Sequence, residues 1–216
     1  MKINIVFLKS KNDFTQKDKN RLKEIINRTI KDASRILEIK EEIINFIIYP
    51  FVGNFLLTQG GIHSKEWIEL IIFPDLNKAP KMENLIKSFV YHEMHHLSRG
   101  FVQYHFGEKP TLIEAIFAEG LATAFEEENI LDYKSQSSVY EPAFIQRQLP
   151  EIKKQKYNVD YDYNQYFSQS GFGYKIGKYF VDLIFNRFPY LNSRMLVRTS
   201  VTELLELLDQ SGINLK

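Results

Sequence analysis

Three of the chain's five histidines fall within five positions, in the segment SFVYHEMHHLSRG at residues 88–100. His92 and His96 are four residues apart, so on a helix both imidazoles lie on one face and can reach a single metal ion. Glu93 lies one step round that helix, where its carboxylate can take a proton from a water molecule beside the metal instead of binding the metal. The pattern H-E-x-x-H therefore predicts a zinc site that activates water.

The same residues allow a second interpretation, a chance pentapeptide whose histidines are hydrogen-bonded in a core. On the helix expected over 81–99, His92, Glu93 and His96 fall within or beside the apolar arc. Burying such groups without partners would cost about 1–3 kcal/mol each, and a metal ion would satisfy them together. His95 lies off that arc, so we expect it either behind the ligands or at the surface.

Two histidines leave a catalytic zinc short of one protein ligand, and the chain has no cysteine to supply it. His105 lies nine residues beyond His96, so the six-residue spacing of a third downstream histidine is absent. A carboxylate from the next helix, expected over 111–129, is the other solution. Glu119 lies on the inward face of that helix, and Gly120 beside it would let a second helix approach closely.

Two residues limit the choice of the third ligand. Glu114 is accounted for by a capping box with Thr111, which satisfies the first free amides of the helix. Glu119 has a structural alternative as well, a core carboxylate that pairs with an arginine such as Arg99.

The segments HEMHH and FAEGLATAF together resemble the gluzincin class of zinc peptidases, in which H-E-x-x-H is followed by a glutamate on the next helix. The stretch E-G-L-A-T-A-F, which begins at Glu119, is similar to the signature around the third ligand of the aminopeptidase branch. The resemblance implies one Zn²⁺ per chain with His92, His96 and Glu119 as ligands and Glu93 as base. Thermolysin-like enzymes carry an aspartate where this chain has Thr123, so the residues behind the ligands must differ.

A closer resemblance, over roughly residues 55–210, is to an uncharacterised bacterial family of predicted zinc-dependent proteases, a domain of unknown function.

Peptide hydrolysis also needs a donor to the oxyanion. The unit Y-K-I-G at residues 174–177 is similar to the unit that carries the transition-state tyrosine in aminopeptidase-type gluzincins, which implies Tyr174 for this role. The alternatives are ordinary aromatic packing of Tyr174, or Tyr161, Tyr163 or Tyr166 in its place. The aminopeptidase motif G-x-M-E-N is absent, so the choice between endopeptidase and exopeptidase stays open.

The elements that must position these residues are a small sheet followed by helices. Periodicity and turn residues predict strands over 2–8, 43–49 and 67–73, helices over 13–39, 81–99, 111–129, 177–188 and 201–208, and a short helix with an irregular segment over 137–170. We therefore predict a single α+β, zincin-like domain over 1–216. A small N-terminal mixed sheet with one covering helix occupies 1–75, and 76–216 is mainly helical.

The strand over 67–73 comes directly before the histidine helix. In zincins the corresponding edge strand binds an extended peptide, so Trp67 and the link at Gly60 and Gly61 are expected to border the substrate. An ordinary strand inside the sheet is the alternative.

Composition narrows the class of protein. The net charge is +1 with both signs mixed, which gives no footprint for nucleic acid or an acidic membrane surface. No stretch approaches the 18 or so apolar residues of a membrane helix, and the N-terminus lacks the pattern of a secretory signal. We expect a soluble, cytoplasmic peptidase that acts on a peptide or protein, with no nucleic-acid or membrane partner and an oligomeric state that the sequence does not indicate.

Two other classes fit part of the pattern. One is a zinc-binding regulatory or chaperone-like module without proteolytic activity, and the other is a metal-free helical domain. Glu93 and Tyr174 favour the enzyme, because a purely structural zinc site needs neither of them.

Overall fold

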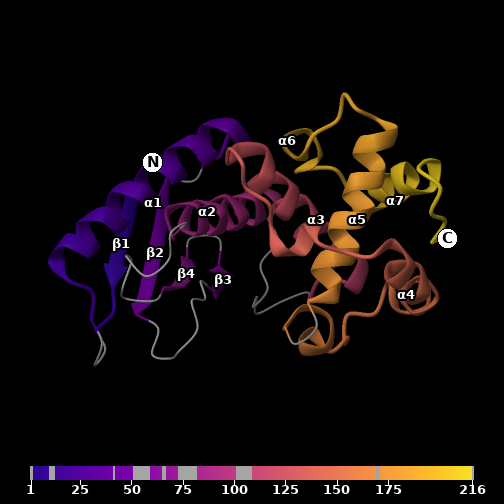
Figure 1. Ribbon diagram of the computed structural model, residues 1–216, viewed down its shortest axis with the longest axis horizontal. Helices are drawn as coiled ribbons and strands as arrows, with labels where there is room; N and C mark the ends of the chain where they lie inside the picture. Colours follow the sequence, from indigo (N-terminus) through magenta and orange to yellow (C-terminus); the bar gives the residue numbers. More distant parts are fainter. Residues whose placement is uncertain are drawn as a thin grey trace. The chain divides into compact units, whose positions relative to one another are not determined.

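The computed structural model describes residues 2–9, 13–40, 42–50, 59–64, 67–72, 82–100, 109–168 and 171–215. The chain divides into two compact units, Met1–Phe106 and Gly107–Lys216. Within the described residues, the first unit carries all the strands and two helices, and the second is helical. The prediction of an α+β fold is therefore confirmed (Figure 1).

The first unit is built on a four-stranded sheet in the order β1-β2-β4-β3. The parallel strands are β1 (Lys2–Phe7), β2 (Ile43–Pro50) and β4 (Trp67–Ile72). They agree with the three predicted strands to within one residue. The fourth strand, β3 (Gln59–Ser64), runs antiparallel to β4, so the sheet is mixed as predicted.

Strand β3 corrects two expectations. Gly60 and Gly61 were expected in a link, but their backbones pair with Leu70 and Glu69 of β4. Glycine has low strand propensity, so the sequence carries no strand signal there. The strand at the edge of the sheet is β3, whereas β4 lies between β2 and β3. β4 is therefore an ordinary internal strand of the sheet, which was the alternative to a peptide-binding edge strand.

The sheet buries one face by strict alternation along its two central strands. In register, Phe46 of β2 lies beside Ile68 of β4, and both are fully buried. The buried positions are Ile44, Phe46, Ile48, Ile68, Leu70 and Ile72. A run of β-branched and apolar residues with period two is what a half-buried strand requires.

Two helices, α1 (Gln16–Leu37) and α2 (Met82–Arg99), pack against each other in this unit (Figure 1). Helix α1 begins at Thr15, whose side chain accepts a hydrogen bond from the backbone amide of Asp18. The first compact unit includes α2 as well as the strands, because α2 packs on α1 and contacts β3. Pro80, the predicted start signal of α2, lies outside the described residues, while Gly100 after its end has a φ of +75°.

The second unit is a group of helices around α3 and α5. Its helices are α3 (Leu112–Asn129), α4 (Pro142–Gln155), α5 (Phe172–Arg187), α6 (Ser193–Leu196) and α7 (Val201–Gln210), with a 3₁₀ turn at Gln136–Ser138 and a π-helical turn at Asn164–Ser168. Helix α5 starts five residues before its predicted start at 177, because tertiary packing overrides the low helix propensity of its glycines. None of the described helices is long and apolar enough to cross a membrane.

Helices α3 and α5 cross at a pair of glycines. A β-carbon built on Gly120 would lie 2.2 Å from the carbonyl carbon and oxygen of Gly177, and one built on Gly177 would lie 2.1 Å from the carbonyl oxygen of Ile116. Side chains cannot occupy these positions without moving a backbone. The predicted close approach at Gly120 is therefore confirmed, and Gly177 is its partner.

We expect Gly177→Ala to destabilise the protein by about 3 kcal/mol, because the methyl group would force α3 and α5 apart. Thermal unfolding followed by circular dichroism measures the change. Lys175→Ala, a change to a partly exposed side chain on the same helix, is the matched control and should stay within about 0.5 kcal/mol of the wild type. Equal unfolding temperatures for Gly177→Ala and the wild type would contradict the close crossing.

A buried ionic network joins α3 to the middle of α5. Lys178, 4% exposed, lies between Glu127 of α3, at 3.3 Å, and Asp182, one turn further along α5. Glu127 also accepts hydrogen bonds from the Ser135 amide and the Ser138 hydroxyl. Burial alone would raise the pKa of Glu127, but these hydrogen bonds and the nearby lysine charge outweigh it, and the pKa is lowered.

A carboxyl with a lowered pKa in the folded state stabilises the fold above its unfolded pKa of roughly 4.3, and this stability is lost as the pH falls through the folded pKa. We therefore expect Glu127→Gln to lose about 2 kcal/mol at pH 7 and to show a shallower loss of stability between about pH 5 and 3. Denaturant unfolding across that range tests this, with the exposed Glu206→Gln as control. A variant whose acid profile parallels the wild type would contradict the role of Glu127.

Candidate metal centre

Helix α2 places the two imidazoles of H-E-x-x-H side by side. The rings of His92 and His96 have centroids 4.6 Å apart, and their Nε2 atoms are separated by 3.0 Å. Two nitrogens bound to one tetrahedral zinc at about 2.0–2.1 Å would lie roughly 3.3 Å apart. The spacing of the two nitrogens is therefore close to what a shared metal ion requires.

Helix α2 is buried on more sides than its sequence predicts. Glu93 and His96 are 5% and 3% exposed, in line with the inward direction expected for them. His95 is fully buried, so its expected alternative as a surface residue is wrong. The physical reason is that α2 packs against α1 and also contacts β3, which covers a wider arc of the helix than the apolar residues indicate.

The position of α2 on α1 is fixed by a hydrogen bond next to the histidines. Tyr91 donates its hydroxyl to the carboxylate of Asp32 on α1 over 2.7 Å. Burial, and then the Asp32 carboxylate, raise the pKa of Tyr91, so its phenol stays protonated and keeps donating. Because Tyr91 directly precedes His92, this contact limits rotation of α2 about its axis.

Glu119 lies on α3, two turns after a well-capped start. The Thr111 side chain accepts a hydrogen bond from the amide of Glu114, and the Glu114 carboxylate accepts one from the amide of Thr111, so the predicted capping box is confirmed. Glu119 itself is 1% exposed, as its inward direction predicts. It directly precedes Gly120, the residue at the crossing with α5.

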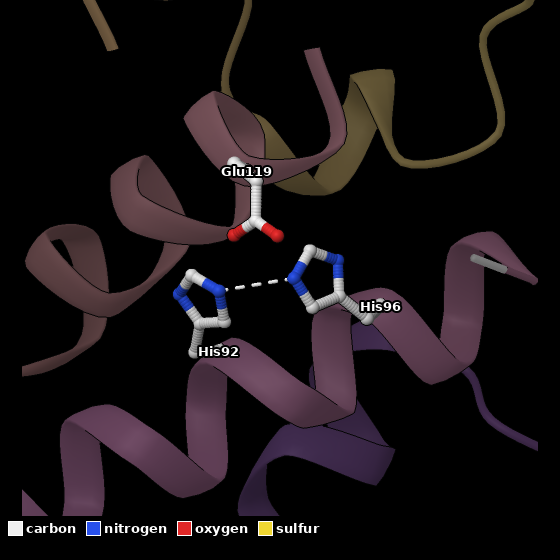
Figure 2. Close-up of side chains that lie close together, drawn as sticks. All are labelled: His92, His96 and Glu119. Carbon is white, nitrogen blue, oxygen red and sulfur yellow. Dashed lines mark hydrogen bonds between the residues drawn. The ribbon is translucent and has the colours of Figure 1, made fainter. Parts of the chain in front are cut away.

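The side chains of His92, His96 and Glu119 form a group that could hold a metal ion, since one possible ligand atom from each lies within 4.8 Å of the others. Figure 2 shows the Glu119 carboxylate directed toward the two imidazoles. Two imidazoles and a carboxylate, with no thiolate, are a donor set that fits zinc. These are the same three residues that the sequence predicts as ligands, and their role as ligands stays a prediction.

An aromatic cluster around Phe167 holds the first turn of α5. Phe167 is buried, and its ring is stacked on Tyr163 at a centroid distance of 5.1 Å and meets Tyr174 edge-on at 5.5 Å. A β-carbon on Gly173 would lie 2.6 Å from the Phe167 ring, so glycine is needed there for Phe167 to fit. Tyr174 therefore takes part in aromatic packing, which was the predicted alternative to a chemical role, and the packing does not exclude that role.

Tyr161 follows a segment that is bonded to the start of α3. The carbonyls of Lys156 and Asn158 accept hydrogen bonds from the backbone amides of Ile113 and Leu112 at the start of α3, each over 3.0 Å. Burial raises the pKa of Tyr161 to about 12, and the negative charges of Glu119 and Glu114 add to this effect. The Tyr161 phenol is therefore neutral at ordinary pH.

Two residues of this cluster have a weak signal in the sequence. Tyr163 was expected only as a substitute for Tyr174, but the hydroxyls of the two lie 3.5 Å apart. Phe167 carries no signal of its own in the sequence, and the glycine at position 173, which leaves room for its ring, is the one signal that could have pointed to it. Thr123, which replaces the aspartate of thermolysin-like enzymes, is 1% exposed, and its hydroxyl has no hydrogen-bond partner among the described residues. His105 and most of the connection over 100–110 lie outside the described residues.

A family model described as predicted Zn-dependent protease (DUF2268) matches residues 18–192. This match covers both the histidines of α2 and Glu119 of α3. Among curated proteins, none matches the chain significantly.

Proposed function

We propose that this chain, which belongs to the family of predicted Zn-dependent proteases, hydrolyses peptide bonds with one zinc ion held by His92, His96 and Glu119. The observation that carries the proposal is the approach of three zinc-type ligand atoms to within 4.8 Å of one another. We also propose that the site is of the gluzincin type, on a zincin-like domain spanning 1–216. The order of the ligands along the chain, two histidines of one helix and a glutamate of the next, supports the gluzincin type.

Zinc would supply a Lewis acid that lowers the pKa of water and polarises the carbonyl of the substrate. Glu93 is the proposed general base, which takes the proton of the attacking water and passes it to the leaving amine. Its place beside His92 on the buried side of α2 supports this role, since it is only 5% exposed. Because this carboxylate is shielded from bulk water, a proton that it takes up passes to the substrate and is not lost to solvent.

Tyr174 is the proposed donor to the oxyanion of the tetrahedral intermediate. Its position on the first turn of α5, braced by Phe167, supports the role because a donor must be held in place before charge develops. The Gly120–Gly177 crossing fixes the helix of Tyr174 against the helix of Glu119. Both groups therefore belong to one rigid arrangement.

The peptide substrate has a matching backbone surface in β3. This strand is at the edge of the sheet and contacts α2, the helix of His92 and His96. An edge strand can pair with an extended peptide through backbone hydrogen bonds, and this recognition suits substrates of varied sequence. We propose β3, in place of the predicted strand at 67–73, as the strand that binds the peptide.

Zinc uptake tests the ligand set. The wild type should bind close to one zinc per chain, and Glu119→Gln should weaken binding by at least about tenfold, because an amide oxygen lacks the charge of the carboxylate. Glu114→Gln is the matched control on α3, since glutamine also completes a capping box. Isothermal titration and metal analysis measure both. Equal zinc affinity for Glu119→Gln and the wild type would remove Glu119 from the ligands.

The role of Glu93 is tested separately from zinc binding. Glu93→Gln should retain zinc but lose about 10²–10⁴-fold in kcat on a fluorogenic peptide library, because the base is gone while the ligands remain. Glu83→Gln, the same change on the exposed part of α2, should leave kcat unchanged. Wild-type activity in Glu93→Gln would contradict the mechanism, and a zinc-loaded wild type that cleaves no peptide would contradict the function.

A further inference from the structure

The hydroxyl groups of Tyr163 and Tyr174 face each other at 3.5 Å. Tyr163 lies just before the π-helical turn Asn164–Ser168, and Tyr174 lies on the first turn of α5, so two different elements bring the phenols together. A π-helical turn is rare and is frequently found at functional sites. The position of the two hydroxyls next to each other is therefore set by the fold of two separate elements.

The two rings share one rigid support. Tyr163 is stacked on Phe167 with an interplanar angle of 25°, and Tyr174 meets the same ring at 87°. Phe167 is 4% exposed and fits only because Gly173 has no side chain. Both phenols are therefore directed by a buried ring that cannot easily move, which holds their oxygens near each other.

We propose that Tyr163 is a positioning residue for the reaction, and that its hydroxyl donates a hydrogen bond to the oxygen of Tyr174. This inference rests on the proposed function, in which Tyr174 donates to the oxyanion. When the Tyr174 oxygen accepts a hydrogen bond, its own O–H becomes more polarised and a stronger donor. The direction also turns the Tyr174 hydrogen away from Tyr163, so that it can be given to the substrate.

The distance between the two hydroxyl oxygens suits a hydrogen bond that shortens during the reaction. At 3.5 Å the oxygens are at the long limit of a hydrogen bond, whose usual O···O distance is about 2.7–2.8 Å. Hydrogen bonds of catalytic groups are often long without substrate and shorten when charge develops. As the Tyr174 O–H is drawn toward the oxyanion, negative charge grows on its oxygen and strengthens the bond from Tyr163.

The neighbouring tyrosines fit this role less well. Tyr166 is 4% exposed, and its ring packs on Phe172, so its hydroxyl belongs to the core of the cluster. The Tyr161 ring meets the rings of Tyr166 and Phe167 edge-on, at centroid distances of 6.0 and 6.2 Å. Among the tyrosine hydroxyls of the described residues, Tyr163 is the one that contacts the hydroxyl of Tyr174.

A double-mutant cycle on the zinc-loaded protein tests the proposal. Tyr174→Phe should lower kcat about 10²-fold, and Tyr163→Phe about 3- to 10-fold with little change in KM, because the lost interaction acts in the transition state. The double variant should equal Tyr174→Phe, since Tyr163 acts only through Tyr174. Tyr166→Phe, which removes a hydroxyl from the same cluster, should stay within about twofold of the wild type. Wild-type kcat in Tyr163→Phe, or additive losses in the double variant, would overturn the proposal.

The pKa of Tyr174 gives a readout that does not depend on turnover. A hydroxyl that donates to Tyr174 stabilises its phenolate, so removing that donor should raise the pKa of Tyr174. NMR titration of protein with ¹³Cζ-labelled tyrosine, with Tyr174→Phe to assign the signal, compares the wild type with Tyr163→Phe. If the zinc-loaded wild type cleaves no peptide, the proposed function fails. The pKa of Tyr174 then decides alone whether Tyr163 donates to Tyr174. A higher pKa in Tyr163→Phe than in the wild type supports this hydrogen bond, and an unchanged pKa overturns it.

Discussion

The contact between Gly120 and Gly177 is the constraint on which the arrangement of the second unit depends. With backbone atoms only 2.1–2.2 Å from where β-carbons would lie, α3 and α5 are closer than any side chain permits. Glu119 directly precedes the first glycine, and Tyr174 lies one turn before the second. The crossing therefore sets the relation between a candidate ligand and a candidate donor through backbone packing, which is stiffer than contacts between flexible side chains.

The histidine pair depends on a different and more local constraint. Helical periodicity alone puts His92 and His96 on one face, and the hydrogen bond from Tyr91 to Asp32 holds that face in place. His96 and Glu93 are both buried on this helix. In the proposed mechanism, Glu93 beside the histidine pair is what distinguishes a hydrolytic site from a structural one.

The parts of the site that could be predicted from the sequence are those that local rules decide. The capping box at Thr111 and the close approach at Gly120 each follow from one residue type at one position, and both are confirmed. Strand β3 could not be predicted, because pairing with β4 overrides the low strand propensity of its glycines. The sequence left open whether His95 is buried or at the surface, since its burial depends on packing between elements that periodicity along one helix does not describe. The hydroxyl pair that includes Tyr163 is a tertiary contact of the same kind.

The central claim is that one zinc ion is bound by His92, His96 and Glu119. A crystal structure of the zinc-loaded chain, with anomalous data collected on both sides of the zinc absorption edge, tests it most directly. The account predicts a single strong anomalous peak about 2.0–2.2 Å from one imidazole nitrogen of each histidine and from a carboxylate oxygen of Glu119. A peak held by other residues, or no peak at these three side chains in protein shown to contain zinc, would contradict it.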